Sequence, residues 1–172
     1  MNSTVWKTQK RSADGAGTSM NIPPRTLLYS LKPIGLGTPF VESFTSHVMH
    51  LAAEHALSIK QLAAVALSGK LNPSDDVVEF FWNTHVLDGV SDRADRWVKA
   101  FEKATGRTDI RYLTLLSFRA AIPEMGLLAK QRKWCSRCLE DWKLSGRPVY
   151  EPLLWRFKRS QGMHRAPDTF DK

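Results

Sequence analysis

The two cysteines of this chain stand close together, as Cys135 and Cys138 in the sequence Trp-Cys-Ser-Arg-Cys. Two thiolates at this spacing can bind one tetrahedral metal ion, most often Zn²⁺. The chain contains no third cysteine, so the remaining ligands must be histidine, carboxylate or water, or come from another chain. His164 is the candidate third ligand, because it is the only histidine downstream of the pair. Asp141, Asp168 or water are the candidates for the fourth position.

The same cysteine pair has two other interpretations. A redox Cys-x-x-Cys places its first thiol at a helix N-terminus that follows a strand. Residues 129–133 do not have the pattern of a buried strand, so the sequence favours zinc over redox chemistry. Two inert thiols are the remaining alternative.

Positive charge is concentrated around the cysteine pair. The chain has a formal net charge of +8, and residues 130–165 contain ten basic and three acidic side chains. This distribution predicts an anionic partner, nucleic acid first, although a solvated basic surface is the simpler alternative. We expect Arg132, Lys133 and Arg137 to contact phosphate groups.

Several functional classes lack their sequence signatures. There is no Gly-rich phosphate loop, no Gly-x-Ser-x-Gly and no His-Glu-x-x-His, so we expect a protein that is not an enzyme. No apolar run reaches the roughly 18 residues of a membrane span. The N-terminus also lacks the apolar region of a secretory signal, which predicts a cytoplasmic protein.

The rest of the chain has the pattern of a mainly α fold. Thr38 and Pro39 predict a helix start, with the helix continuing to His55. Ser58 and Gln61 form a capping box that predicts a second helix immediately afterwards. Two helices joined this tightly form either a helix-turn-helix-like unit or an ordinary αα-hairpin.

Further helices are expected from Asn72-Pro73, from Ser91 to Gly106 and from Thr108 to Pro123, without a convincing sheet. Four regions follow from these patterns. They are a disordered tail at 1–21, a helical domain with the helix-turn-helix-like unit at 22–128, a zinc-ribbon-like or zinc-finger-like module at 129–158, and a frayed tail at 159–172.

Four segments carry a resemblance to a known family. They are ESFTSHVMHLAAEHALS from Glu42, LTLLSFRAAIP from Leu113, RKWCSRCLEDW from Arg132 and GRPVYEPLLWRFK from Gly146. In this order and spacing they resemble the TniQ family of bacterial transposition proteins, from about residue 24 to about residue 158. The third segment followed by the fourth is the specific part of the match.

The resemblance implies an adaptor. Proteins of this family link a chosen target site to an AAA+ ATPase regulator that recruits the transposase. Some contact attachment-site DNA, and others act with an RNA-guided CRISPR effector, so the implied location is the nucleoid of a bacterial cytoplasm. The family's second ligand pair, Cys-Pro-x-His, falls here on Met163 and Ala166, and this departure leaves the zinc site incomplete. A sequence-specific helix-turn-helix regulator and an inactive remnant are the alternatives.

Overall fold

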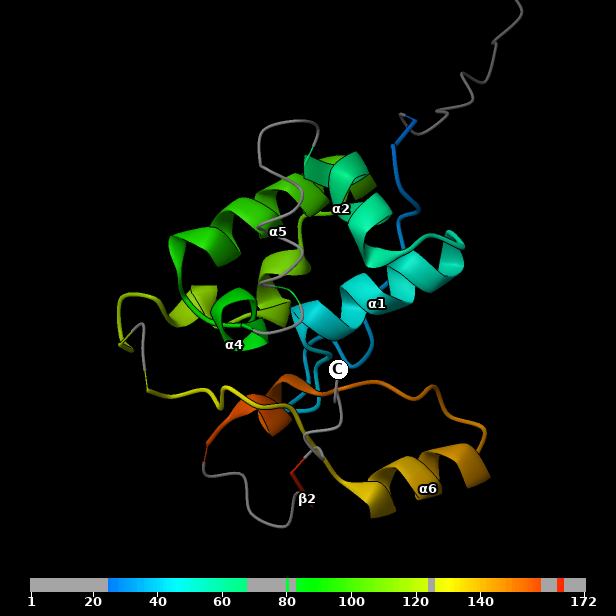
Figure 1. The fold of residues 1–172 in the computed structure, drawn as a ribbon, viewed down its shortest axis with the longest axis vertical. Coiled ribbons are helices and arrows are strands. Elements are labelled where there is room, and N and C mark those ends of the chain that lie inside the picture. The colour runs from blue at the N-terminus through cyan, green and yellow to red at the C-terminus, as the bar shows by residue number, and fades with distance from the viewer. Residues whose placement is uncertain (1–24, 68–79, 81–82, 124–125, 159–163, 166–172) are drawn as a thin grey trace, which may run out of the picture.

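A computed structural model of the chain describes residues 25–67, 80, 83–123, 126–158 and 164–165. The described part is mainly helical, as the sequence predicts (Figure 1). None of its helices has the length and apolar character that crossing a membrane requires. The α-helices are α1 (Phe44–Glu54), α2 (Ile59–Leu67), α4 (Thr84–Leu87), α5 (Asp92–Thr105) and α6 (Ser136–Leu144). The 3₁₀ helices are η1 (Ile110–Leu113), η2 (Leu116–Phe118) and η3 (Leu153–Arg156), and the strands are β1 (Lys133–Trp134) and β2 (His164–Arg165).

Helix α1 begins later than the sequence suggests. Its N-cap is Ser43, whose hydroxyl accepts a hydrogen bond from the amide of Ser46. The predicted start at Thr38 and Pro39 is wrong, because the Thr38 hydroxyl donates backwards to the carbonyl of Gly35 and closes a turn. Residues 33–42 therefore form a loop that leads into α1.

The predicted capping box of α2 is confirmed. The amide and the hydroxyl of Ser58 both donate to Gln61 Oε1, and the Gln61 amide donates to the Ser58 hydroxyl. The tight link between α1 and α2 uses Ala56 in the left-handed region, with φ of 51°. The predicted helix from Asn72-Pro73 begins outside the described residues.

Helix α5 supplies the centre of the core. Its predicted ends are confirmed: the Ser91 hydroxyl accepts from the amide of Ala94, and Gly106 follows the helix with φ of 70°. Trp97 lies in the middle, fully buried and stacked on Phe101 at 5.8 Å between ring centroids. The single helix predicted after Thr108 is instead two short 3₁₀ helices, η1 and η2.

The N-terminal arm lies on this core. Leu28 is buried, and its amide donates to the carbonyl of Ala104 at the end of α5. The arm is further held where the ring of Tyr29 stacks on His55, with 4.0 Å between centroids. Residues 25–32 therefore form an arm that packs on the core.

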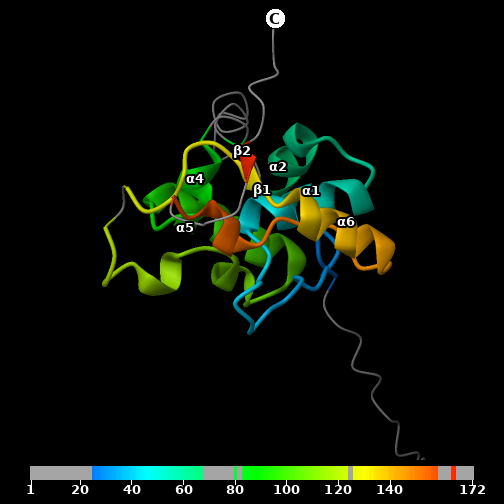
Figure 2. The ribbon, with the colours of Figure 1, turned by 90° about the horizontal axis from the view of Figure 1, so that it is seen from below.

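The described part of the last third is small, and the predicted zinc-ribbon-like or zinc-finger-like module stays a prediction. Its elements are the two-residue antiparallel pair β1–β2 and the helix α6. Residues 150–158 then return to the helices, where Pro152 and Phe157 form isolated bridges with Glu42 and Leu128 (Figures 1 and 2). These contacts cross the boundary at 128/129 that the sequence predicts, and that boundary stays a prediction.

Candidate functional site

The cysteine pair sits at the start of α6. Cys135 is the N-cap residue, and its sulfur accepts a hydrogen bond from the amide of Cys138 at 3.3 Å. The two Sγ atoms are 2.7 Å apart. Burial, followed by contact with Cys135, raises the pKa of the Cys138 thiol to about 11. The two sulfur atoms therefore face each other, although 2.7 Å is closer than two thiolates bound to one tetrahedral zinc ion would be. They lie at a strand-to-helix turn, which is the context that a redox pair needs and that the sequence did not predict.

The cysteine pair provides the right type of ligand for zinc, but too few ligands to complete a site. Thiolates are preferred zinc ligands, and Cys135 and Cys138 supply two of the four that a structural site needs. Strand pairing brings the backbone of His164 opposite Trp134, which precedes Cys135. Within the described ranges, no group of three or more His, Cys, Asp and Glu side chains forms a possible metal site. The side chain of His164 and the whole of Asp168 lie outside what the structure describes, so ligation by His164, Asp141 or Asp168 stays a prediction.

The three predicted phosphate contacts have different surroundings. Arg132 forms an ion pair with Glu151, at 3.2 Å between Nη1 and Oε1. The Lys133 ammonium donates to the backbone carbonyls of Phe157 and Lys158, at 3.0 and 2.6 Å. Arg137 is exposed on α6. Two of the three cations are therefore used to hold the final segment in place, and phosphate contact by any of them stays a prediction.

The helix pair α1–α2 offers little for reading DNA. The sequence offers Lys60, Gln61 and Lys70 as polar side chains in and after α2. Gln61 is engaged in the capping box, and Lys70 lies outside the described residues. Lys60 is the remaining polar side chain. Because a recognition helix needs several such groups, this geometry favours the ordinary αα-hairpin.

A buried carboxylate joins α1 to the final segment. Glu42 is fully buried, and its oxygens lie 2.6 Å from His50 Nδ1 and 3.3 Å from His47 Nδ1. Ser46 donates its hydroxyl to the same carboxylate. Burial alone would raise the pKa of Glu42, but hydrogen bonds from His47 and His50 lower it to about 2. We call Glu42, His47, His50 and the segment 149–153 the Glu42 clasp.

His50 has an acceptor at each end of its ring. Nδ1 faces the carboxylate of Glu42, and Nε2 lies 3.0 Å from the carbonyl oxygen of Val149. Both ring nitrogens must carry a proton to donate to two acceptors, so His50 is an imidazolium ion in this arrangement. The hydrogen bond to Glu42 accordingly raises the pKa of His50 above its usual value.

A second buried ion pair fixes η3. Arg156 Nε lies 2.8 Å from Asp88 Oδ2, and the guanidinium also donates to the hydroxyl of Thr84. Asp88 accepts further hydrogen bonds from the amide and the hydroxyl of Thr45. Burial raises the pKa of Asp88, while Arg156 and Thr45 oppose this shift. The pair ties the final segment to α1 and α4.

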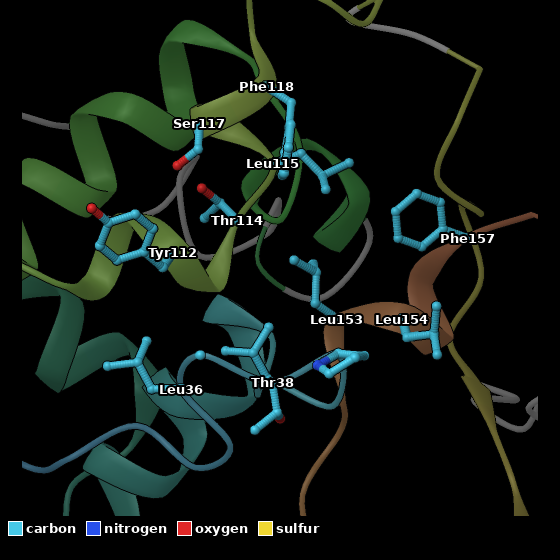
Figure 3. Close-up of a pocket in the computed structure, with 13 residues that line it drawn as sticks. Leu36, Thr38, Tyr112, Thr114, Leu115, Ser117, Phe118, Leu153, Leu154 and Phe157 are labelled. Carbon is cyan, nitrogen blue, oxygen red and sulfur yellow. The ribbon is translucent and has the colours of Figure 1, made fainter.

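An apolar cleft of about 650 Å³ opens beside the clasp (Figure 3). Three segments of the chain build it, namely the loop before α1, the η1–η2 region and the η3 region. Its polar side chains are largely engaged within the fold, since Thr114 donates to Arg111 and Thr38 donates to Gly35. Its lining is Leu36, Gly37, Thr38, Pro39, Val41, Tyr112, Thr114, Leu115, Ser117, Phe118, Leu153, Leu154 and Phe157.

Sequence reasoning did not identify the clasp. From the sequence alone, His47 and His50 have the pattern of ordinary core or surface histidines, because no carboxylate pattern around them indicates a catalytic site. Glu42 precedes the N-cap of α1, so helical periodicity does not place it near them. The histidines at 47 and 50, three residues apart on one helix, were the only available signal.

One known family matches the chain. A family model described as TniQ matches residues 33–161, which is most of the chain. The matched stretch includes the cysteine pair, the Glu42 clasp, the Asp88–Arg156 pair and the lining of the cleft. No curated protein gives a significant match to the chain.

Proposed function

The chain belongs to the TniQ family, a family of transposition proteins, and on that premise we propose that it is a non-catalytic adaptor. In this role it links recognition of a target site to an AAA+ ATPase regulator of DNA transposition. The target side is either attachment-site DNA or an RNA-guided CRISPR effector bound to DNA. The function requires two binding surfaces and no reactive centre.

The apolar cleft is the observation that carries the protein-binding half of this proposal. Tyr112 and Phe118 at the cleft are more than half exposed, at 55% and 58%, although both are large and apolar. Exposed aromatic side chains around an apolar hollow are typical of protein–protein contacts. We propose that apolar side chains of the ATPase regulator occupy the cleft.

A pull-down tests this assignment. Filaments of an AAA+ ATPase from a TniQ-containing transposon, assembled on duplex DNA with ATP, are expected to retain the chain. Phe118→Glu and Leu154→Glu should abolish retention, because each places a charge at an apolar contact. The matched control is Leu144→Glu, since Leu144 is 88% exposed on α6, away from the cleft. Equal retention of all three variants would reject the cleft as the contact.

We also propose a structural zinc ion for the last third of the chain. Cys135 and Cys138 would hold it, with His164 as the third ligand and a fourth ligand from water, Asp141 or Asp168. The pairing of β1 with β2 supports His164, because it keeps the two backbones adjacent. Zinc in such a site supplies a cross-link between chain segments and no reactivity.

A further inference from the structure

A second hollow surface lies beside the segment 153–158, which also lines the apolar cleft. Two cavities of about 570 and 560 Å³ adjoin there and share Lys130 and Lys158 in their linings. Lys133 and Gln131 line the first cavity, and His85 of α4 lines the second. We call these five residues together the lysine groove.

Backbone pairing fixes the two shared lysines. The amide of Ala129 donates to the carbonyl of Arg156, and the amide of Lys158 donates to the carbonyl of Leu127. Figures 1 and 2 both show these two segments running beside α4. The chain is extended at Phe157, so consecutive side chains point to opposite sides. Phe157 therefore enters the apolar cleft, while Lys158 enters the lysine groove.

The positive charge of the groove is not neutralised within the described structure. Neither Lys130 nor Lys158 forms an ion pair with a carboxylate of the described residues. The acidic group that most affects His85 is Asp88, which is engaged by Arg156. Two exposed lysines, Lys130 and Lys158, therefore line the groove, and the nearby carboxylate of Asp88 is already paired with the buried Arg156.

His85 lies close to the same positive charges. Burial lowers its pKa, and the charges of Arg156, Lys130 and Lys158 lower it further. Its Nδ1 atom is buried without a hydrogen-bond partner among the described residues. A groove lined by Lys130 and Lys158, neither paired with a described carboxylate, is suited to an anion with several oxygen atoms.

We propose that the lysine groove binds the phosphate backbone of duplex DNA without reading its sequence. The lysine ammonium groups are the side chains that neutralise phosphates in sequence-independent binding. A single strand is the less suitable ligand, because such sites use aromatic rings to stack bases and no Phe, Tyr or Trp lines the groove in the described residues. The choice of nucleic acid rests on the proposed transposition function.

Fluorescence anisotropy with two unrelated labelled duplexes tests the proposal. The chain should bind both equally, and the double variant Lys130→Ala/Lys158→Ala should bind roughly 10- to 100-fold more weakly at 100 mM salt. The slope of log affinity against log salt should fall by roughly two in magnitude. The control is Lys60→Ala/Lys103→Ala, which removes two exposed lysines from α2 and α5 and should leave both quantities unchanged. Thermal unfolding of both double variants should match the parent chain, because all four side chains are exposed.

Three results would overturn the proposal. One is an equal loss in the groove and control variants, which would show a general effect of net charge. Another is preferential binding of single-stranded DNA, or stronger competition by polyglutamate than by unlabelled duplex, which would assign the groove to a different polyanion. The third is competition by millimolar inorganic phosphate at constant ionic strength, which would identify an isolated phosphate site.

The ATPase pull-down separates this proposal from the proposed function. If the groove variant binds DNA normally but the parent chain is retained by the ATPase, the groove assignment fails and the adaptor role stands. If the parent chain binds DNA through the groove but is not retained by any ATPase, the adaptor role fails instead. This comparison uses ATPase that carries no DNA, so that retention cannot pass through the groove. Because the groove variant leaves the cleft intact, its retention by the DNA-free ATPase should be unchanged.

Discussion

The imidazolium of His50 connects two parts of the chain that are 99 positions apart, at His50 and Val149. Its charge is balanced by Glu42, which stays ionised at all ordinary pH values because its pKa is about 2. Glu54 adds a weaker favourable charge, and His47 is the other titratable group at the same carboxylate. The protonation of a single side chain therefore controls one attachment of the final segment.

Stability should fall at alkaline pH for this reason. The folded pKa of His50 is raised above 6.5, so its contribution is fully present below pH 6.5 and is lost as the pH rises through the folded value. Urea unfolding at pH 6 and pH 9 should show a lower free energy of unfolding at pH 9. His50→Gln should cost roughly 1–2 kcal/mol at pH 6 and reduce the pH dependence. An unchanged pH dependence in His50→Gln would contradict this account.

Residue-level prediction from sequence succeeded where a local pattern existed. Ser58 with Gln61 and Ser91 with Gly106 were identified because caps depend on neighbours in the chain. The roles of Glu42 and Asp88 were not identified, because their partners are not local. Glu42 precedes the N-cap of the helix that carries His50, and Asp88 is 68 positions before Arg156. The helix start predicted at Thr38 was wrong. A threonine hydroxyl can hydrogen-bond either to a preceding carbonyl or to a following amide, and the sequence does not decide between the two.

Among the described helices, α6 differs from the others in having no buried residue. Its attachment is a stack of three rings, in which Trp142 lies between Tyr150 and Trp155 with centroid distances of 4.7 and 5.6 Å. Sequence analysis expected a metal-organised module here and did not predict the helix. The stack joins rings from three places in the chain, and no periodicity in one segment reveals it.

The zinc proposal makes a prediction for this element. The purified chain should contain about one equivalent of zinc, and Cys135→Ser should remove it. Loss of zinc should increase amide exchange in residues 133–144, whereas α1, α2 and α5 should remain protected because their core excludes that segment. Metal analysis and hydrogen exchange measure the two effects. If the parent chain contains no metal and the amides of α6 are still protected, the zinc proposal is rejected. The Trp142 stack would then be sufficient to hold α6 in place.

At the scale of the whole molecule, the final segment is shared by both proposed surfaces. Leu153, Leu154 and Phe157 line the apolar cleft, and Lys158 lines the lysine groove. The mainly α class and the family were predicted from the sequence. The two surfaces were not, because each is assembled from segments separated by many residues.

Arg156 should therefore affect both surfaces together. Arg156→Met leaves Asp88 buried without its partner and is expected to cost about 3–5 kcal/mol. Urea unfolding measures this cost, and ATPase retention and duplex affinity should both fall at temperatures where the helices remain folded. By contrast, Phe118→Glu should affect retention alone, and Lys130→Ala/Lys158→Ala should affect DNA alone. Loss of one activity without the other in Arg156→Met would show that the segment does not couple them.

The extended backbone at Phe157 has one more consequence. Side chains of an extended chain alternate between two sides. A shift of the backbone by a single position would therefore turn Lys158 towards the apolar cleft and the ring of Phe157 towards the lysine groove. The two amide-to-carbonyl bonds with Leu127 and Ala129 resist such a slip, and the buried guanidinium of Arg156 prevents it. The Asp88–Arg156 ion pair therefore keeps Phe157 at the apolar cleft and Lys158 at the lysine groove.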